Sequence, residues 1–209
     1  MLFVRFCRSF SSKHSCSWTP FYRFPLFKQS AFTLLELLVC LVLVGVLLVS
    51  GAPGLQGWVQ RSQADQAQAR LLGLLQYARN SALSFGVPVS VCGSRVSGVC
   101  DGEWSAGVLI FLDLDGDGQH SGDERVLRVA AGAEQVRVAW RSFGNRPFLQ
   151  FTPLGFTRGQ SGNFTLCVAS DPAPLARQLI VSAGGRVRVA VDADGDGQVE
   201  DANGDPLRC

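Results

Sequence analysis

The sequence lacks lysine after Lys28 and contains only two histidines, His14 and His120. Without clustered histidines, and without metal-ligand spacing among the cysteines, a zinc site is disfavoured. No Gly-x-Ser-x-Gly segment is present either, and beyond residue 31 the only histidine that could act as a base is His120. These absences argue against an enzyme.

Acidic side chains are missing from residues 1–31, a segment that carries five basic ones: Arg5, Arg8, Lys13, Arg23 and Lys28. The remaining residues hold 14 basic and 17 acidic side chains, a formal balance of −3. A basic leader therefore precedes a mildly acidic body, and 209 residues favour one globular domain with appendages. The later cations are all arginines, which either reflects genomic base composition or suits bidentate recognition of phosphate or carboxylate.

Charge is absent again from residues 37–60, where Leu, Val and Gly dominate. As a helix this segment is long enough to cross a hydrocarbon core of about 30 Å, so one transmembrane span is predicted. The cations precede the span, and the positive-inside rule then keeps residues 1–31 in the cytoplasm. The body is expected on the outer side of a bacterial inner membrane, in the periplasm.

Two features separate this span from a secretory signal peptide or a plain anchor. A signal peptide has its small-residue cleavage site after the apolar run, whereas Ala31 lies before it. Glu36 lies at the start of the span, where a carboxylate costs about 2.5–3.5 kcal/mol and is expected to need a partner. Pro53 lies within the span.

The run Ala31-Phe32-Thr33-Leu34-Leu35-Glu36 resembles the class III signal of type IV prepilins. The resemblance implies cleavage by a prepilin peptidase between Ala31 and Phe32, N-methylation of Phe32, and pairing of Glu36 with the N-terminal amine of a neighbouring subunit during assembly. Ala31 departs from the family pattern, which usually has Gly there. The alternative is a plain signal anchor in which this run occurs by chance.

A long helix is predicted over residues 32–85, with a transmembrane half at 32–60 and an amphipathic half at 61–85. Its apolar residues beyond the span recur at steps of three and four: Ala64, Ala67, Leu71, Leu74, Ala78 and Ala82. Gly86 and Pro88 are expected to end the helix.

Residues 86–209 contain short β-rich runs separated by Gly, Asn, Asp and Pro. The runs are 87–92, 108–112, 125–129, 136–140, 148–152, 164–168, 179–182 and 187–191. Their close spacing predicts an antiparallel sheet packed on the helix, so the expected fold class is α+β, a type IV pilin-like body.

Several runs resemble the GspH/FimT family of minor pilins and pseudopilins. They are Gln76-Tyr77-Ala78-Arg79-Asn80-Ser81-Ala82, Val91-Cys92, Trp104 with 107–113, Phe151-Thr152-Pro153-Leu154-Gly155, and Phe164-Thr165-Leu166-Cys167. The resemblance implies assembly with other pilins or pseudopilins into a type II secretion pseudopilus or a type IV pilus, from the inner membrane.

The segment Gly184-Gly185-Arg186-Val187-Arg188 resembles the GRxR segment of FimT-type pilins that bind DNA during natural transformation. Arginines at i and i+2 of a strand point to one face, and Gly185 lets a backbone approach a phosphate closely. Arg158 and Arg177 are candidates to extend the pair. The alternative is a Gly-Gly hairpin turn with solvated arginines, which the −3 balance of the body favours.

Two Asp-Gly segments fit calcium-loop spacing. Asp113, Asp115, Asp117 and Glu124, with Gly118 at the sixth position, match the oxygen ligands of an EF-hand loop. Flanking strands would make this at best an EF-like loop, and Asp-Gly repeats also simply form turns. The second segment, from Asp192 to Gly197, has Asn203 where the bidentate Glu belongs. Calcium is a possible ligand, and no cofactor is required; a membrane-anchored calcium-binding module is a third interpretation.

Four of the seven cysteines lie in the body: Cys92, Cys100, Cys167 and Cys209. Three pairings are possible, and Cys92–Cys100 with Cys167–Cys209 is preferred, because the first closes a short loop and the second ties down the C-terminal tail. Disulfides indicate an oxidising compartment. Cys40 is expected to act as a small apolar residue in the span.

Overall fold

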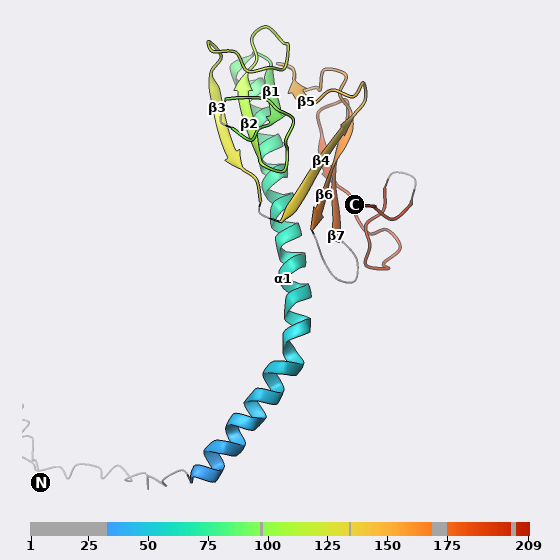
Figure 1. The fold of residues 1–209 in the computed structure, drawn as a ribbon. Helices are drawn as coiled ribbons and strands as arrows, with labels where there is room; N and C mark the ends of the chain where they lie inside the picture. Colours follow the sequence, from blue (N-terminus) through green and yellow to red (C-terminus); the bar gives the residue numbers. More distant parts are fainter. Residues whose placement is uncertain (1–32, 97, 134, 169–174, 202–203) are drawn as a thin grey trace, which may run out of the picture. The chain divides into compact units, whose positions relative to one another are not determined.

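The computed structural model describes residues 33–96, 98–133, 135–168, 175–201 and 204–209, and only the backbone of residues 49–56. Its helix is α1 (Leu34–Phe85), and the strands that follow are β1 (Val89–Gly93), β2 (Gly107–Leu112), β3 (Val126–Ala131), β4 (Val136–Ser142), β5 (Phe148–Phe151), β6 (Gly162–Val168), β7 (Leu175–Val181) and β8 (Val187–Val189). Figure 1 shows their arrangement. The chain divides into two compact units, Met1–Val49 and Ser50–Cys209.

In the first unit, Thr33 caps the start of α1. The Thr33 carbonyl accepts hydrogen bonds from the amides of Glu36 (3.0 Å) and Leu37 (3.2 Å), and the Thr33 hydroxyl accepts one from the Glu36 amide at 3.3 Å. Every side chain from residue 34 to residue 48 is exposed, and most are Leu or Val. Within the described residues, no helix is both long and apolar enough to cross a membrane. The predicted span at 37–60 includes residues 49–56, whose side chains lie outside the description.

In the second unit, the amphipathic part of α1 packs its predicted stripe into the core. The six stripe residues are buried, and Leu75 between them has no exposed surface. The helix ends at Phe85 as predicted, where Gly86 adopts a φ of 68° and its amide donates to the Ala82 carbonyl at 3.0 Å. The helix therefore presents one apolar face, against which the strands pack.

The strands form two antiparallel four-stranded sheets, rather than the single sheet expected from the sequence. Sheet A has the order β3-β2-β1-β5, and sheet B has the order β4-β6-β7-β8. The chain passes between them in the short connection from β3 to β4, where Gln135 adopts a φ of 66°. Buried residues of α1 and of both sheets form one core cluster, so the α+β fold class is confirmed.

Each of the eight predicted β-rich runs overlaps one strand, and the largest difference is at β7. This strand begins at Leu175, four residues before the predicted start. Arg177 lies at an inward position of β7, where its Nε forms an ion pair with Asp65 Oδ1 on α1 at 2.8 Å. A charged side chain on the inner face interrupts the apolar alternation that identifies a strand, which explains the late prediction.

Candidate functional site

The predicted DNA-contacting arginines lie at the hairpin between β7 and β8. The turn at 182–186 is closed by a hydrogen bond from the Ser182 amide to the Arg186 carbonyl at 3.0 Å. Arg188 lies on β8, opposite Ile180 of β7. Arg186 and Arg188 are both exposed, and within the described residues neither guanidinium has a hydrogen bond or an ion pair.

Gly185 makes a close backbone approach, but to this chain's own Gly155. It has a φ of 73°, and a Cβ built there would collide with the Gly155 carbonyl oxygen. By contrast, a Cβ at Gly184 would come no nearer than 3.8 Å, to the Ser182 hydroxyl. The requirement for glycine at 185 therefore has a packing cause within the fold.

The hairpin is held in place from two directions. Arg79 of α1 donates from Nε to the Gly155 carbonyl at 2.9 Å and from Nη2 to the Gly184 carbonyl at 3.3 Å. The Thr157 amide donates to the Ala183 carbonyl at 3.0 Å. These bonds fix the turn on the body, so that Arg186 and Arg188 are presented from a rigid support. Arg79 carried no signal in the sequence for this role, because its two acceptors lie 76 and 105 residues away.

Arg158 and Arg177, the candidates to extend the pair, are occupied within the body. Arg177 is paired with Asp65 on α1. Arg158 donates from Nη1 to the Gln150 side-chain oxygen at 3.2 Å and to the Gly116 carbonyl at 3.4 Å. Neither guanidinium is therefore free to join Arg186 and Arg188.

In the first Asp-Gly segment, three predicted ligands come together and the fourth does not. Carboxylate oxygens of Asp113, Asp115 and Asp117 lie within 4.8 Å of one another. The carboxylate of Glu124 instead accepts hydrogen bonds from the amides of Leu114 (2.8 Å) and Ser121 (3.0 Å). The spacing of Glu124 is that of a calcium ligand, but its side chain closes the loop.

Asp113 also has a structural function in this segment. It is fully buried, and its carboxylate accepts hydrogen bonds from the amides of Gly116 (2.7 Å) and Gly118 (3.0 Å). Ser90 of β1 and Gln150 of β5 donate to the same carboxylate. A buried carboxylate that receives four donors is stabilised as an acceptor, so Asp113 anchors the loop to sheet A.

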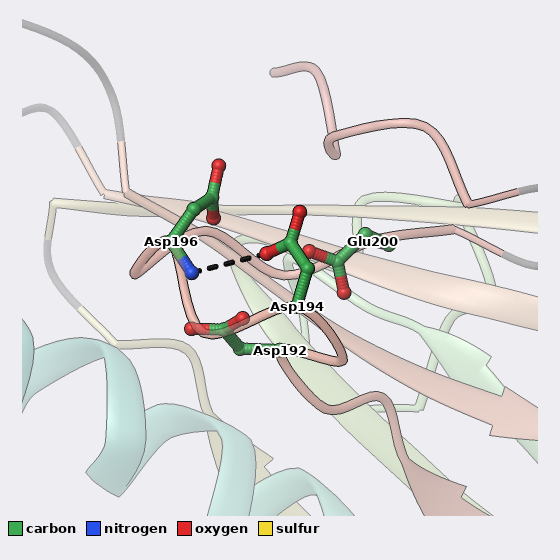
Figure 2. Close-up of side chains that lie close together, drawn as sticks. All are labelled: Asp192, Asp194, Asp196 and Glu200. Atoms are coloured by element: carbon green, nitrogen blue, oxygen red, sulfur yellow. Dashed lines mark hydrogen bonds between the residues drawn. The ribbon is translucent and has the colours of Figure 1, made fainter.

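The second Asp-Gly segment gathers four carboxylates on an exposed loop (Figure 2). Oxygens of Asp192, Asp194, Asp196 and Glu200 lie within 4.8 Å of one another. Asn203, which occupies the position of the bidentate Glu, lies outside the described residues. Glu200 was not predicted as a ligand, because it occupies the ninth position of the loop pattern and the bidentate Glu belongs at the twelfth.

The two loops share the heptapeptide pattern Asp-x-Asp-Gly-Asp-Gly-Gln and the same backbone hydrogen bonds. In each loop, the carboxylate of the first Asp accepts hydrogen bonds from the amides of both glycines. The carboxylate of the second Asp accepts one from the amide of the third Asp, and the carboxylate of the third Asp accepts one from the amide of Gln. These hydrogen bonds hold the aspartates together within each loop, and exposed acidic groups often gather on a surface, so the grouping of the carboxylates alone does not establish a metal centre. Calcium binding by either loop stays a prediction.

The structure pairs the body cysteines in the preferred way. Cys92 is joined to Cys100, and Cys167 of β6 is joined to Cys209. The second disulfide holds the C-terminal tail against sheet B, where Figure 1 shows the C-terminus near β6 and β7. Cys40 is a free, exposed thiol on α1.

The predicted processing and assembly residues lie at the start of the described region. Ala31 and Phe32 fall outside the described residues. Glu36 is exposed in the first turn of α1. The Thr33-Leu34-Leu35-Glu36 run also fits a helix capping box, in which a Thr cap is followed three residues later by Glu. Glu36 therefore has a local structural function to weigh beside the predicted pairing.

Comparison with known proteins identifies two regions of similarity. A family described as type II transport protein GspH matches residues 67–185, and the prokaryotic N-terminal methylation motif matches residues 26–52. A crystal structure of the type IV minor pilin FimU of Pseudomonas aeruginosa is 23% identical, with a TM-score of 0.50, covering 64% of this chain and 92% of FimU. A second crystal form of FimU gives 24% identity and a TM-score of 0.47, with 61% and 92% covered. No curated protein matches the chain.

Proposed function

Because this chain belongs to the GspH family of type II transport proteins, we propose that it assembles through α1 into a type II secretion pseudopilus or a type IV pilus. The family is that of minor pilins and pseudopilins, which are structural subunits rather than enzymes. The GspH match covers residues 67–185, which include five of the six stripe residues of α1 and seven of the strands. This match carries the proposal.

The N-terminal segment supports assembly from a membrane. The methylation motif at residues 26–52 implies a membrane-anchored component of a pilus or pseudopilus. Residues 34–48 of α1 expose apolar side chains on every side of the helix. A helix that is apolar all round is stable when surrounded by lipid or by other apolar helices. Both surroundings would occur in turn if the subunit left the inner membrane for a fibre, with its body in the periplasm.

Glu36 is the residue proposed to pair with the N-terminal amine of a neighbouring subunit. Its position also suits capping of α1, and the two functions require different chemistry. Pairing needs the negative charge, whereas a capping box accepts Gln in place of Glu. Glu36→Gln therefore removes the proposed pairing and keeps the local structure of the helix start.

The test compares Glu36→Gln with Thr33→Ala in cells that produce the fibre. Glu36→Gln should leave membrane insertion intact and abolish recovery of the subunit in sheared fibres. Thr33→Ala, which removes the cap but keeps the charge, should still assemble. Normal fibre incorporation of Glu36→Gln would rule out the pairing mechanism.

Processing at Ala31 and Phe32 is tested separately. Intact mass and N-terminal sequencing of the membrane form should find a chain that begins at methylated Phe32 when a prepilin peptidase is present. The full leader should remain in a peptidase-null strain. A leader that remains in both strains would leave a membrane-anchored domain without pilin processing.

A second candidate function is binding of DNA by the β7–β8 hairpin. The observation that favours it is the exposure of Arg186 and Arg188, without partners in the described residues, on a turn held by Arg79 and Thr157. Two arginines on a turn with a fixed backbone could hold a phosphate backbone without reading bases. Replacing both arginines with Gln should weaken binding of duplex DNA at low salt; equal binding by parent and variant would exclude the hairpin as a contact.

A further inference from the structure

The strand register of sheet B places arginines at both ends of one row. Arg141 of β4 is opposite Asn163 of β6, Asn163 is opposite Ile180 of β7, and Ile180 is opposite Arg188 of β8. Residues directly opposite each other point to the same face of a sheet. The neighbouring Phe164 points into the core, so this row lies on the outer face. Three strand spacings of about 4.8 Å separate β4 from β8, so the Cα atoms of Arg141 and Arg188 lie about 14 Å apart.

A second arginine on β4 extends the face along the strand direction. Arg137 precedes Arg141 by four residues, which keeps it on the same face about 13 Å away. Arg137 and Arg141 are both exposed, and within the described residues neither has a hydrogen bond or an ion pair. Together with Arg186 and Arg188, they place four unpaired guanidinium groups on or beside one sheet face. The formal balance of −3 for the body conceals this concentration of charge.

A groove lies between this face and the C-terminal tail. It has a volume of about 450 Å³, and its lining includes Arg137, Arg141, Asn163 and Thr165 from the sheet. The tail, tied down by the Cys167–Cys209 disulfide, contributes Arg208 together with Asp201 and Asp205. The sheet wall is therefore basic and polar, and the acidic side chains lie on the tail wall.

The residue types on the sheet wall indicate the ligand. Arg, Asn and Thr are side chains that contact phosphate oxygens, and arginine does so bidentately. Duplex DNA carries one charge per about 1.7 Å of its axis when both strands are counted, so about eight phosphates lie within about 14 Å of axis and those on the near side face the sheet. Arginines whose Cα atoms lie about 13 to 14 Å apart suit a ligand that carries several phosphates along its length.

The same face offers little to a single strand. Binding of single-stranded nucleic acid relies on aromatic side chains on which successive bases stack. Among the described residues of sheet B, none of those that point to its outer face is aromatic. Phe143, which follows β4, is one exposed ring and could not stack a run of bases.

We propose that the outer face of sheet B binds the phosphate backbone of duplex DNA, with Arg137 and Arg141 as a second contact region beside the β7–β8 hairpin. This inference rests on the second candidate function above. Because the contacts are to phosphates, binding is independent of base sequence and falls steeply with salt. On the tail wall, the negative charge of Asp205 repels the phosphates.

The test measures anisotropy of a labelled duplex titrated with the full chain in a non-ionic detergent, at several salt concentrations between about 50 and 200 mM. The groove variant is Arg137→Gln with Arg141→Gln, and the hairpin variant is Arg186→Gln with Arg188→Gln. A matched control, Arg61→Gln with Arg125→Gln, removes the same charge from exposed positions elsewhere. Melting curves verify that each variant folds.

The groove variant should weaken binding about tenfold and reduce the slope of log K against log salt by about 1.8, while the control changes neither by as much. Asp205→Asn should tighten binding, a change that loss of folding could not produce. If the hairpin variant alone loses affinity, the groove proposal is overturned and DNA binding stands. If the parent does not bind duplex, DNA binding itself fails. Tighter binding of single strands, or equal displacement by poly-glutamate, would also overturn the proposal.

Discussion

The backbone of Gly185 packs directly against the backbone of Gly155. Both glycines adopt positive φ angles, 73° and 76°, and each lies in a turn closed by its own amide. Arg79 lies beside both glycines and donates to the Gly155 carbonyl. This contact joins the turn after β5 to the β7–β8 hairpin, and so links sheet A to sheet B away from the core.

Replacement of Gly185 by Ala should therefore destabilise the body. The added Cβ meets the Gly155 carbonyl, and a non-glycine residue at this φ costs about 1–3 kcal/mol before any displacement of the turn. Thermal unfolding should show a lower Tm than for Gly184→Ala, where the added Cβ makes only an ordinary contact with the Ser182 hydroxyl at 3.8 Å. Equal melting of the two variants would contradict the packing assignment.

Loss of the Cys167–Cys209 disulfide should release the tail. The bond closes a loop with a sequence separation of 42, against 8 for Cys92–Cys100, and the loop-entropy account makes the longer one more stabilising by about 1.5 kcal/mol. Cys167→Ala with Cys209→Ala should speed hydrogen exchange at Leu207, whose amide donates to the Val199 carbonyl at 2.8 Å. The matched variant of Cys92 and Cys100 should leave this exchange unchanged. Slow exchange at Leu207 in both variants would show that other contacts hold the tail.

The stability of the Cys92–Cys100 loop should depend on pH through Asp101. The Asp101 carboxylate accepts hydrogen bonds from the amides of Glu103 (2.9 Å) and Arg95 (3.2 Å). The bond from Glu103 is the main reason that the pKa of Asp101 lies below its ordinary value, against a smaller opposing effect of desolvation. The pKa of Asp101 is lower in the folded protein than in the unfolded chain. Its contribution to the free energy of unfolding is therefore complete above the unfolded pKa of about 3.9 and is lost as pH falls through the folded pKa.

Asp101→Asn should accordingly reduce the fall in melting temperature that the parent shows as pH is lowered. Melting temperatures of parent and variant, measured from about pH 5 downward, should converge as the carboxylate is protonated. Glu103→Gln, which keeps the backbone amide, serves as the control. Parallel curves for parent and Asp101→Asn would exclude this carboxylate as a source of acid sensitivity.

If calcium binds, the exposed loop should be the stronger site. Four carboxylates gather at Asp192–Glu200, and Glu200 stays in this cluster while it accepts a hydrogen bond from the Ala193 amide. In the first loop only the three aspartates gather, and Glu124 accepts hydrogen bonds from the amides of Leu114 and Ser121. Calcium should raise the Tm of the parent reversibly on chelation, and Asp194→Asn with Asp196→Asn should remove most of the rise. The matched change at Asp115 and Asp117 should remove less. An unchanged Tm at about 1 mM calcium, the weak end of protein sites, would exclude calcium binding.

The fold could be predicted where periodicity is local. The stripe on α1 and the eight β-rich runs are visible because each depends on neighbours within a few residues. The division into two sheets was not predicted because it depends on the β3–β4 connection, where the described residue Gln135 adopts a positive φ that its residue type does not predict. The start of β7 was missed because Arg177 points inward, and its partner Asp65 is 112 residues away.

The candidate sites follow the same rule. Arg186 and Arg188 are two residues apart, and their shared face follows from the strand period alone. Their relation to Arg141 depends on the order of strands in sheet B, which places β4 and β8 at opposite edges. Likewise, spacing identified Glu124 as a ligand, but the direction of its side chain depends on the amides of Leu114 and Ser121.

The shared heptapeptide gives this chain an internal control. The same seven-residue hydrogen-bonding pattern lies in the hairpin between β2 and β3, where buried Asp113 anchors it to sheet A. It also lies in an exposed segment after β8, where the partners of Asp192 among the described residues belong to its own loop. In both loops a glutamate carboxylate accepts a hydrogen bond from the amide of the second loop residue. The pairs are Glu124 with Leu114 in the first loop and Glu200 with Ala193 in the second. Any difference in metal affinity, exchange rate or proteolysis between the two loops can therefore be attributed to their surroundings and to the position of that acid, since the turn itself is held constant within one molecule.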